Sequence, residues 1–416
     1  IVFGGILQLL LGNGSKVISQ AMEWIGIVGN GYISLLQMLV MPLVFISIVG
    51  AFTKMKSSKK LGKISANVLV TLLATTAIAA LIGIAAVMVF GLDGATFTAR
   101  IKELADRQSM VQNFSIPQQI LSFIPTNVFA DFAGTRPTST IGVVIFAAFV
   151  GIAFLGVRRK APKEAEFFAN LIESLYKVVM RIVTLVLRLT PYGVFALMTN
   201  VLATSDFEAI VNLGKFILAS YSALIVVLLV HSIILLGVKV NPINFFKKAF
   251  PALSFAFTSR SSAGTLPMNI ETQTKALGVD EATANFAGSF GISIGQNGCA
   301  GVYPAMLATI VAPTVGVNVF DLKFIVMLIA IVTISSFGVA GVGGGATFAS
   351  LIVLGAMNLP VAIVGLVISV EPMIDMARTA VNVSGSMVAG VVTSERIHEL
   401  DREILHDENA SIEVNS

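Results

Sequence analysis

Charged residues are scarce in this sequence, and their scarcity excludes an ordinary soluble domain. Asp, Glu, Lys and Arg together make up 12% of the 416 residues, against about 25% in a typical soluble domain. Hydrophobic residues make up 56%, and the mean hydropathy is +0.89. Apolar runs of about 20 residues, the length that crosses a bilayer core, recur along the chain. The composition therefore predicts an all-α polytopic membrane protein.

Cysteine and histidine are also rare, which removes several kinds of chemistry. Cys299 is the only cysteine, so no disulfide can form within the chain. His231, His398 and His406 are scattered, and the sequence contains no Cys/His metal set. No nucleophile, base and orienting group occur together in a recognisable pattern, so we do not expect an enzyme. His231 lies in an apolar run, where it is either a hydrogen-bonded packing residue or a proton relay.

The charge that is present falls between the apolar runs and predicts the orientation of the chain. Short basic loops occur at 54–63, 158–163 and 239–248, and the positive-inside rule places them in the cytoplasm. The formal charge of +4 therefore concerns topology and the anionic leaflet, not nucleic acid. Residues 1–12 are interpreted as the end of a helix rather than a signal peptide, and 396–416 as a solvated, partly disordered cytoplasmic tail. The apolar runs fall at 24–52, 64–91, 117–157, 166–200, 209–238, 282–313, 323–357 and 361–394.

Two stretches in the C-terminal half are interrupted too early to be simple crossings. The sequence TSRSSAGTLP breaks the region 242–275, and SSFGVAGVGGG breaks the region 321–360. Each half has about 10–14 residues, too few to span, and irregular backbone at membrane depth is tolerated only inside protein or beside a water-filled cavity. We expect two re-entrant helical hairpins, each followed by a long helix, which together form an inverted repeat around a binding site. Two kinked helices with small packing residues are the alternative.

The last predicted helix carries the strongest functional signal, a polar stripe at spacings of three and four residues on one face. A charged group at a helix centre costs roughly 2.5–3.5 kcal/mol on insertion scales, so three in one span indicate a functional site. The alternative is an internal Asp375–Arg378 ion pair that only orients the helix. Pro372 lacks an amide hydrogen and is expected to kink the helix there. The stripe consists of Glu371, Asp375, Arg378, Thr379, Asn382 and Ser386.

The two hairpin tips and the helix between them offer groups for a solute and a cation. The first tip, Arg260–Thr265, combines hydroxyls with a cation, and the helix N-terminus after it would favour a carboxylate. The second tip, Ser336–Gly345, is rich in glycine and could move as a gate. The sequence GISIGQNGCAG breaks helix 282–313, where freed carbonyls could coordinate Na⁺ or the glycines could pack helices closely. A channel is the first rival of a transporter, but buried charges beside a gate favour a site that occludes its solute.

Four motifs resemble the dicarboxylate/amino acid:cation symporter family, which includes the glutamate transporters. They are MLVMPLVF at 38–45, TPYGVFAL at 190–197, RSSAGTLP at 260–267 and DMARTAVNV at 375–383. The resemblance covers nearly the whole chain, and within the family it is greatest to the bacterial L-cystine uptake carriers. It implies a glutamate-transporter-like fold with eight transmembrane helices, two re-entrant helical hairpins and inverted repeats.

The resemblance also implies an assembly and a mechanism. The protein would be a homotrimer in the bacterial inner membrane and a secondary-active, cation-coupled symporter with an elevator mechanism. Residues 1–241 would be mostly scaffold and trimerisation helices, with 64–91 and 209–238 partly in the moving transport region. Residues 242–395 would form the transport core, and 396–416 the cytoplasmic tail. The core would consist of the hairpin 242–275, the broken helix 282–313, the hairpin 321–357 and the helix 361–394.

By motif match, the resemblance implies the residues of a substrate site. Asp375 would take the α-amino group, Arg378 would face the distal side chain, and Ser262 with the tip amides would hold the α-carboxylate. The expected solute is L-cystine, with an acidic amino acid or a C4-dicarboxylate as the alternative, and no cofactor is expected beyond a coupling Na⁺ or H⁺. The implied substrate-binding set is Ser261, Ser262, Ala263, Val339, Ala340, Gly341, Asp375, Arg378, Thr379 and Asn382. The implied Na⁺ set is Gly291, Ser293, Gly295, Asn297, Ser336 and Asn382.

Two acidic ligands of the sodium-coupled members are replaced by neutral residues in this chain. Where those members read NMDGT, this chain reads GQNGC at 295–299, so that Asn297 replaces an acidic ligand, and Ser386 replaces another. Buried Na⁺ without a carboxylate is held by dipoles alone, so we expect fewer than three sodium ions per substrate. A Na⁺ site built from carbonyls, or protonation of Glu371 or Asp375, would supply the coupling.

Overall fold

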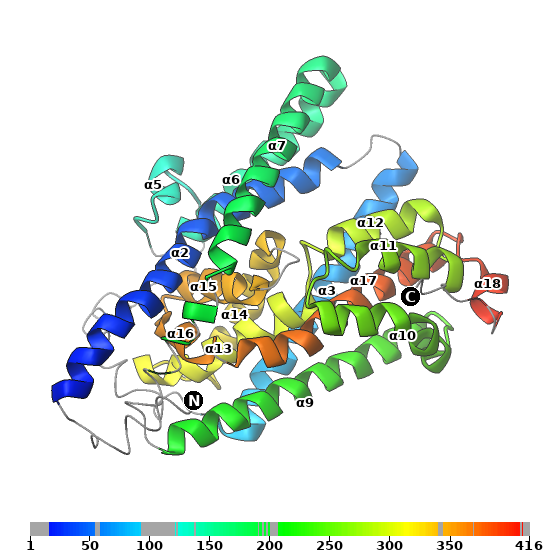
Figure 1. The fold of residues 1–416 in the computed structure, drawn as a ribbon. Coiled ribbons are helices and arrows are strands. Elements are labelled where there is room, and N and C mark those ends of the chain that lie inside the picture. The colour runs from blue at the N-terminus through cyan, green and yellow to red at the C-terminus, as the bar shows by residue number, and fades with distance from the viewer. Residues whose placement is uncertain are drawn as a thin grey trace.

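The computed structural model is all-helical over the residues that it describes, as the composition predicts. These residues are 16–54, 59–92, 121, 124–136, 139–189, 191–193, 195, 196, 199, 207–339, 344–368, 370–407 and 410. Figure 1 shows the helices gathered around α17 (Glu371–Arg396), which packs against α3 (Lys59–Phe90), α9 (Phe207–Gly237), α10 (Pro242–Ser259) and α12 (Glu281–Gly291).

A second group of helices comes from the N-terminal part of the chain. The long helix α2 (Lys16–Lys54) packs along α6 (Ser139–Lys160) and α7 (Pro162–Leu187), and the short α5 (Val128–Phe132) lies against α6. Pro162 stands in the first turn of α7, where its missing amide hydrogen costs nothing. Figure 1 shows the C-terminal end of α6 and the N-terminal end of α7 projecting together away from the other helices.

Four of the described helical segments are long and apolar enough to cross a membrane. They are Gly62–Phe90, Gly142–Lys160, Leu213–Gly237 and Asn297–Val315. Since this test rests on length and composition alone, the eight predicted crossings stay a prediction.

The first interrupted stretch folds into two helices joined by a turn. α10 ends at Ser259, and Arg260 adopts the left-handed conformation with φ of 53°. The chain then turns through 262–265 into α11 (Leu266–Glu271) and the π-helical turn η3 (Thr272–Ala276). With 18 residues, α10 is longer than the half-length predicted from the sequence.

The helix after it is broken where the glycines predict a break. α12 ends at Gly291, and Gly295 has a φ of +67°, which only glycine adopts readily. The chain resumes as the π-helical turn η4 (Asn297–Val302), α13 (Tyr303–Val311) and η5 (Ala312–Val315). Every residue of η4 is buried, and η4 contacts α3, α9, α13, α14 (Leu322–Ser335), α15 (Gly345–Ala356) and α17. Single π-helical turns often mark functional positions.

The second interrupted stretch also forms two helices that pack against each other. α14 is followed by the turn η6 (Ser336–Gly338), and α15 begins after Gly344, whose φ is 86°. Both interruptions therefore fall where the sequence predicts them. That each helix pair enters a membrane and returns to the side it came from, the two pairs from opposite sides, stays a prediction.

Pro372 starts a helix instead of kinking one, so the predicted kink is wrong. α16 (Ala362–Val367) ends first, and α17 begins at Glu371 with Pro372 in its first turn. At that position proline loses no hydrogen bond, because the first N–H groups of a helix have no partner within it. The predicted helix 361–394 is thus two helices, and Glu371 lies at the N-terminus of the second.

The start of the C-terminal tail, as far as residue 407, contacts the helical core. The short α18 (Arg402–His406) follows α17, and the buried ammonium of Lys248 on α10 holds it in place. Lys248 Nζ donates to the carbonyl oxygens of Ala276, Ile404 and Leu405 at 2.9, 2.8 and 2.9 Å. Asp401, Glu403, His406 and Asp407 are exposed, so the segment is solvated on one side and anchored on the other, and residues 408–409 and 411–416 lie outside the described part of the chain.

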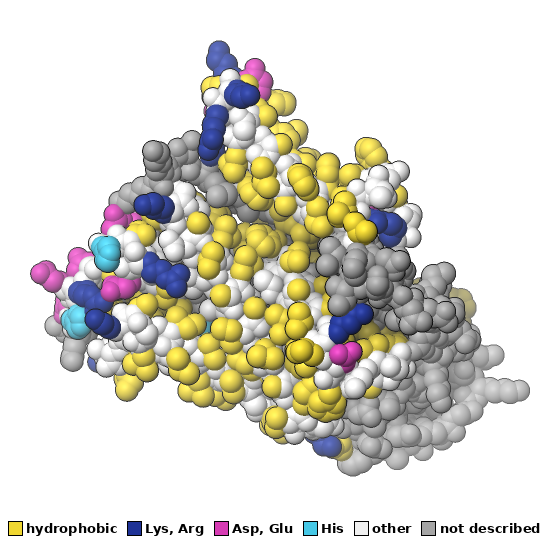
Figure 2. All heavy atoms as spheres, turned by 180° about the vertical axis from the view of Figure 1, so that it is seen from behind, with side chains coloured by type: hydrophobic (Ala, Val, Ile, Leu, Met, Phe, Trp, Pro, Cys, Tyr) yellow, Lys and Arg dark blue, Asp and Glu magenta, His cyan; other side chains and the backbone are white. Residues whose placement is uncertain are grey.

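The ion-pair residues of α17 lie inside the molecule, and many large apolar side chains lie on its outside. Val89, Phe250 and Ile233 are 81%, 68% and 67% exposed, whereas Arg378 and Asp375 are 0% and 2% exposed. Figure 2 shows hydrophobic side chains spread over the visible face, with most charged side chains near its ends. This distribution suits a protein surrounded by lipid, since ionisable groups in membranes face the protein interior.

Candidate binding site

A buried ion-pair cluster lies in the first two turns of α17. Arg378 Nη2 donates to Glu371 Oε1 at 2.5 Å and to Asp375 Oδ1 at 3.2 Å. Spacings of three and four residues bring the three side chains to one helix face. The Asp375–Arg378 pair that the sequence offers as an alternative is therefore present, and Glu371 extends it. With both acids ionised, the two carboxylates outweigh one guanidinium, and the cluster can still attract a cation.

Tyr303 completes this cluster and is the residue that sequence reasoning missed. Arg378 Cζ lies 4.2 Å from the centroid of its ring, an arrangement that attracts a cation to the ring face. The Tyr303 hydroxyl, Arg378 Nε and Arg378 Nη1 are buried and have no hydrogen-bond partner among the described residues. Tyr303 lies in an apolar run, and its place one turn after Cys299 is the one signal that could have found it.

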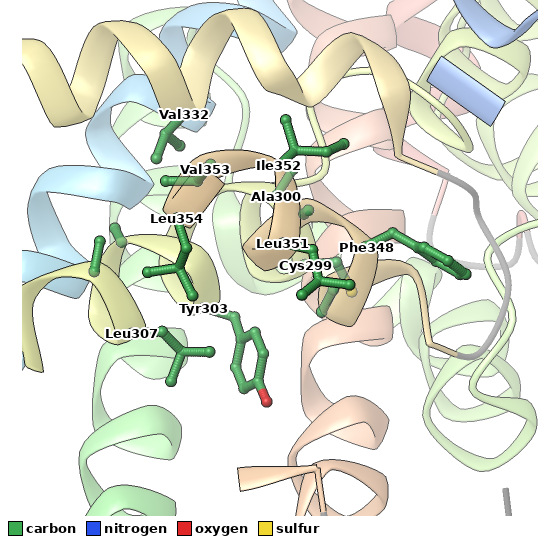
Figure 3. Packing of buried hydrophobic residues seen from close by; sticks show 14 of the residues in the cluster. Cys299, Ala300, Tyr303, Leu307, Val332, Phe348, Leu351, Ile352, Val353 and Leu354 are labelled. Carbon is green, nitrogen blue, oxygen red and sulfur yellow. The ribbon is translucent and has the colours of Figure 1, made fainter. Parts of the chain in front are cut away.

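The surroundings of Tyr303 are otherwise apolar. Figure 3 shows its ring beside Leu307 and Leu354, with the hydroxyl end pointing away from the labelled residues of α15. The ring also meets Phe216 of α9 edge to face, at a centroid distance of 5.9 Å. The ring is thus packed in the hydrophobic core, with the guanidinium of Arg378 on one of its faces.

Asn382 joins this helix face to the unwound segment. Its Oδ1 accepts the backbone N–H groups of Gly298 at 2.8 Å and Cys299 at 3.3 Å, and its Nδ2 donates to Gln296 Oε1 at 3.3 Å. A methyl group on Gly298 would lie 2.8 Å from Arg378 Cα, so glycine permits this close approach of η4 to α17. Thr379 is buried next to Arg378.

A second polar network surrounds Asn297 on η4. Its Nδ2 donates to Thr75 Oγ1 at 2.9 Å and Thr76 Oγ1 at 3.2 Å, so its Oδ1 is free to accept. His231 Nε2 lies 3.0 Å from that oxygen, and His231 Nδ1 lies 3.0 Å from Ser384 Oγ. The Asn297 contact therefore assigns the ring proton to Nε2, with Nδ1 accepting from Ser384. These contacts agree with the packing interpretation of His231, and the proton relay stays the alternative.

The structure brings together only part of the predicted substrate-binding set. Asp375, Arg378 and Asn382 meet at η4, as described above. Ser261–Ala263 lie in the turn after α10, and Ser262 is buried. The helix α10 itself packs along α17. Val339 is buried after η6, and 340–341 lie outside the described residues. The convergence of both hairpin tips on Asp375 stays a prediction.

The predicted Na⁺ ligands fit a sodium ion only in part. Among the described residues, no group of three or more His, Cys, Asp and Glu could hold a metal. The amide oxygens of Asn297 and Asn382 are already engaged, and Ser336 Oγ donates to Thr333 O at 2.7 Å. The remaining candidates are at or after the end of α12 and could supply backbone carbonyls; they are Gly291, Ser293 and Gly295.

A charged, buried site inside an apolar helical molecule is an arrangement expected of a membrane transporter. The chain belongs to the sodium:dicarboxylate symporter family, whose model matches residues 1–396. It is 57% identical to the L-cystine uptake protein TcyP of Shouchella clausii, over 100% of this chain and 90% of that protein. It is also 57% identical to the proteins of that name from Bacillus licheniformis and Bacillus subtilis, over 100% of this chain and 91% and 90% of theirs. The resemblance seen in the four sequence motifs is confirmed.

Proposed function

We propose that this protein imports L-cystine by cation-coupled symport. The observation that carries the proposal is the buried cluster of Glu371, Asp375 and Arg378, which keeps unpaired donors beside a surplus carboxylate. Such a cluster suits a solute with both an ammonium and a carboxylate group. Relatives at 57% identity over the whole chain carry the name of L-cystine uptake proteins, which supports cystine as that solute.

Each polar group has a role in this proposal. Asp375 binds the α-amino group, and Ser262 with the amides of the first tip binds the α-carboxylate. Arg378 faces the distal end, while Asn382 joins α17 to η4 and Thr379 adds a hydroxyl. The alternative solutes are aspartate or glutamate, whose two carboxylates lie closer together than those of cystine. C4-dicarboxylates are a further alternative, but they lack the amine that Asp375 would bind.

The proposed mechanism is an elevator in a homotrimer of the bacterial inner membrane, with a cytoplasmic C-terminus. The two groups of helices, one around α2 and one around α17, correspond to a scaffold and a moving transport region. The two interrupted helix pairs act as re-entrant hairpins entering from opposite sides. Single-cysteine labelling near 262 and 340, in a Cys299→Ser background, tests this arrangement. Reaction of both tips from one side only, in every state of the carrier, contradicts it.

Competition uptake tests the substrate. Purified protein in proteoliposomes should take up labelled L-cystine, with unlabelled cystine competing best, aspartate and glutamate less well and succinate poorly. Asp375→Asn and Arg378→Ala should each abolish uptake, whereas Lys275→Ala, on an exposed helix surface, should retain it. Succinate outcompeting every amino acid would reject the role of Asp375, and aspartate outcompeting cystine would reject cystine as the preferred solute.

A further inference from the structure

Arg378 uses only part of its hydrogen-bonding capacity within the described part of the protein. Nη2 alone donates to both acidic partners, Glu371 and Asp375. Nε and Nη1 are buried and have no partner among the described residues. Because a buried guanidinium N–H without an acceptor is unfavourable, these groups favour a ligand that brings an acceptor into the site.

Tyr303 is held in place beside these unpaired groups. It is the first residue of α13, its ring lies against the Arg378 guanidinium, and Phe216 packs on it from α9. The residue is 1% exposed, so its hydroxyl has no access to bulk water. Buried tyrosine hydroxyls almost always have a partner, and this one has none within the described part of the chain.

Cys299 lies beside Asp375 and one turn before Tyr303. Cys299 Sγ lies 3.9 Å from Asp375 Oδ1 and 3.1 Å from Asn382 Nδ2. Tyr303 follows Cys299 by about one helical turn, so both lie on the same side of the η4–α13 segment. A ligand whose amine is at Asp375 would therefore extend along Cys299 toward the hydroxyl of Tyr303.

We propose that Tyr303 contacts the substrate and determines its specificity: its hydroxyl, with the unpaired N–H groups of Arg378, binds the distal carboxylate of the amino acid whose α-amino group meets Asp375. This inference rests on the proposed function as an amino-acid carrier. It assigns to the chain a selectivity for amino acids with a second carboxylate, because a phenol donates a hydrogen bond to that group. The ring of Tyr303 positions the guanidinium of Arg378, and its hydroxyl donates a hydrogen bond to the distal carboxylate of the ligand.

Tyr303→Phe separates these two roles, since it removes the hydroxyl and keeps the ring. Binding to purified protein is measured for L-cystine and for the mixed disulfide of L-cysteine with ethanethiol, which has no distal carboxylate. Loss of one hydrogen bond to a charged group should weaken cystine binding by about tenfold or more. Binding of the ethanethiol disulfide should change less than about twofold. Tyr303→Leu removes the ring as well and should weaken both ligands.

Tyr221→Phe is the matched control, because that hydroxyl already donates to Met373 O at 2.7 Å outside the cluster; its two affinities should equal those of the wild type. Unchanged cystine binding in Tyr303→Phe, or equal weakening of both ligands, would overturn the proposed contact. If the wild type binds glutamate but not cystine, the proposed substrate fails instead. Glutamate and 2-aminobutyrate, which differ by the distal carboxylate, then test Tyr303 in the same way.

Discussion

At the scale of single residues, the two polar networks differ in how completely their groups are paired. Around Arg378, donors of the guanidinium and the hydroxyl of Tyr303 have no partner among the described residues. Around His231, each ring nitrogen and both ends of the Asn297 amide are hydrogen-bonded. An incompletely paired buried network favours a ligand, whereas a complete one makes the structure rigid. We therefore assign recognition to the first network and positioning of η4 to the second.

The positioning role of His231 predicts a loss of stability when its hydrogen bonds are removed. His231→Phe keeps a ring but leaves Asn297 Oδ1 and Ser384 Oγ without their partner, at roughly 1–3 kcal/mol for each buried group left unpaired. The melting temperature of the purified protein should fall accordingly. Ser232→Ala is the control, because that hydroxyl only donates to Leu228 O in its own helix. A His231→Phe protein as stable as Ser232→Ala would show that the network contributes nothing.

Residue types decide how much of the site the sequence could predict. The sequence identifies Asp375, Arg378 and Asn382, because charged and amide side chains in an apolar helix are unfavourable in a membrane and therefore indicate function. Tyr303 and His231 share apolar runs with many packing residues, and only the crossing of separate helices shows what they contact. Glu371 was found as part of the stripe, but its partner depends on where α17 begins.

At the scale of helices, the breaks are predictable and the junctions are not. The runs of glycine and serine correctly predict the ends of α10, α12 and α14, because such residues weaken helices. Pro372 has two readings, a kink or a first turn, and the sequence does not distinguish them. The docking of α18 depends on Lys248. The sequence indicates only that this lysine belongs to a basic cytoplasmic loop.

Lys248 predicts a local loss of order at the C-terminus. Lys248→Met keeps an unbranched apolar stem but removes the ammonium that three backbone carbonyls accept from. Charge-assisted hydrogen bonds are stronger than neutral ones, so residues 401–407 should detach and become sensitive to limited proteolysis. Lys247→Met, at the exposed neighbouring position, should leave the digestion pattern unchanged. Equal protection in both variants would show that α18 is held by its apolar contacts alone.

At the scale of the whole molecule, composition predicts that the protein is surrounded by lipid, and the local sequence pattern predicts the helices. An apolar exterior and a polar centre follow from burying ionisable groups away from lipid. How the two groups of helices pack against each other depends on contacts between residues far apart in sequence, such as Asn297 with Thr75. No local pattern contains that information, and the motifs predict it only through the family resemblance.

The distribution of charge in the whole core leads to the last prediction, which concerns ion coupling. Asn297 and Ser386 stand where the resemblance implies acidic Na⁺ ligands in the sodium-coupled members. Asn297 Oδ1 is hydrogen-bonded to His231, and Ser386 Oγ donates to Ala287 O at 2.9 Å. Neither position offers a carboxylate to offset the dehydration of a sodium ion. Fewer than three Na⁺ should therefore accompany each substrate. Reversal potentials of uptake in proteoliposomes, under imposed Na⁺ and H⁺ gradients, measure the stoichiometry directly. A value of three Na⁺ per substrate would mean that backbone carbonyls and hydroxyls replace both missing acids, and the prediction would be rejected.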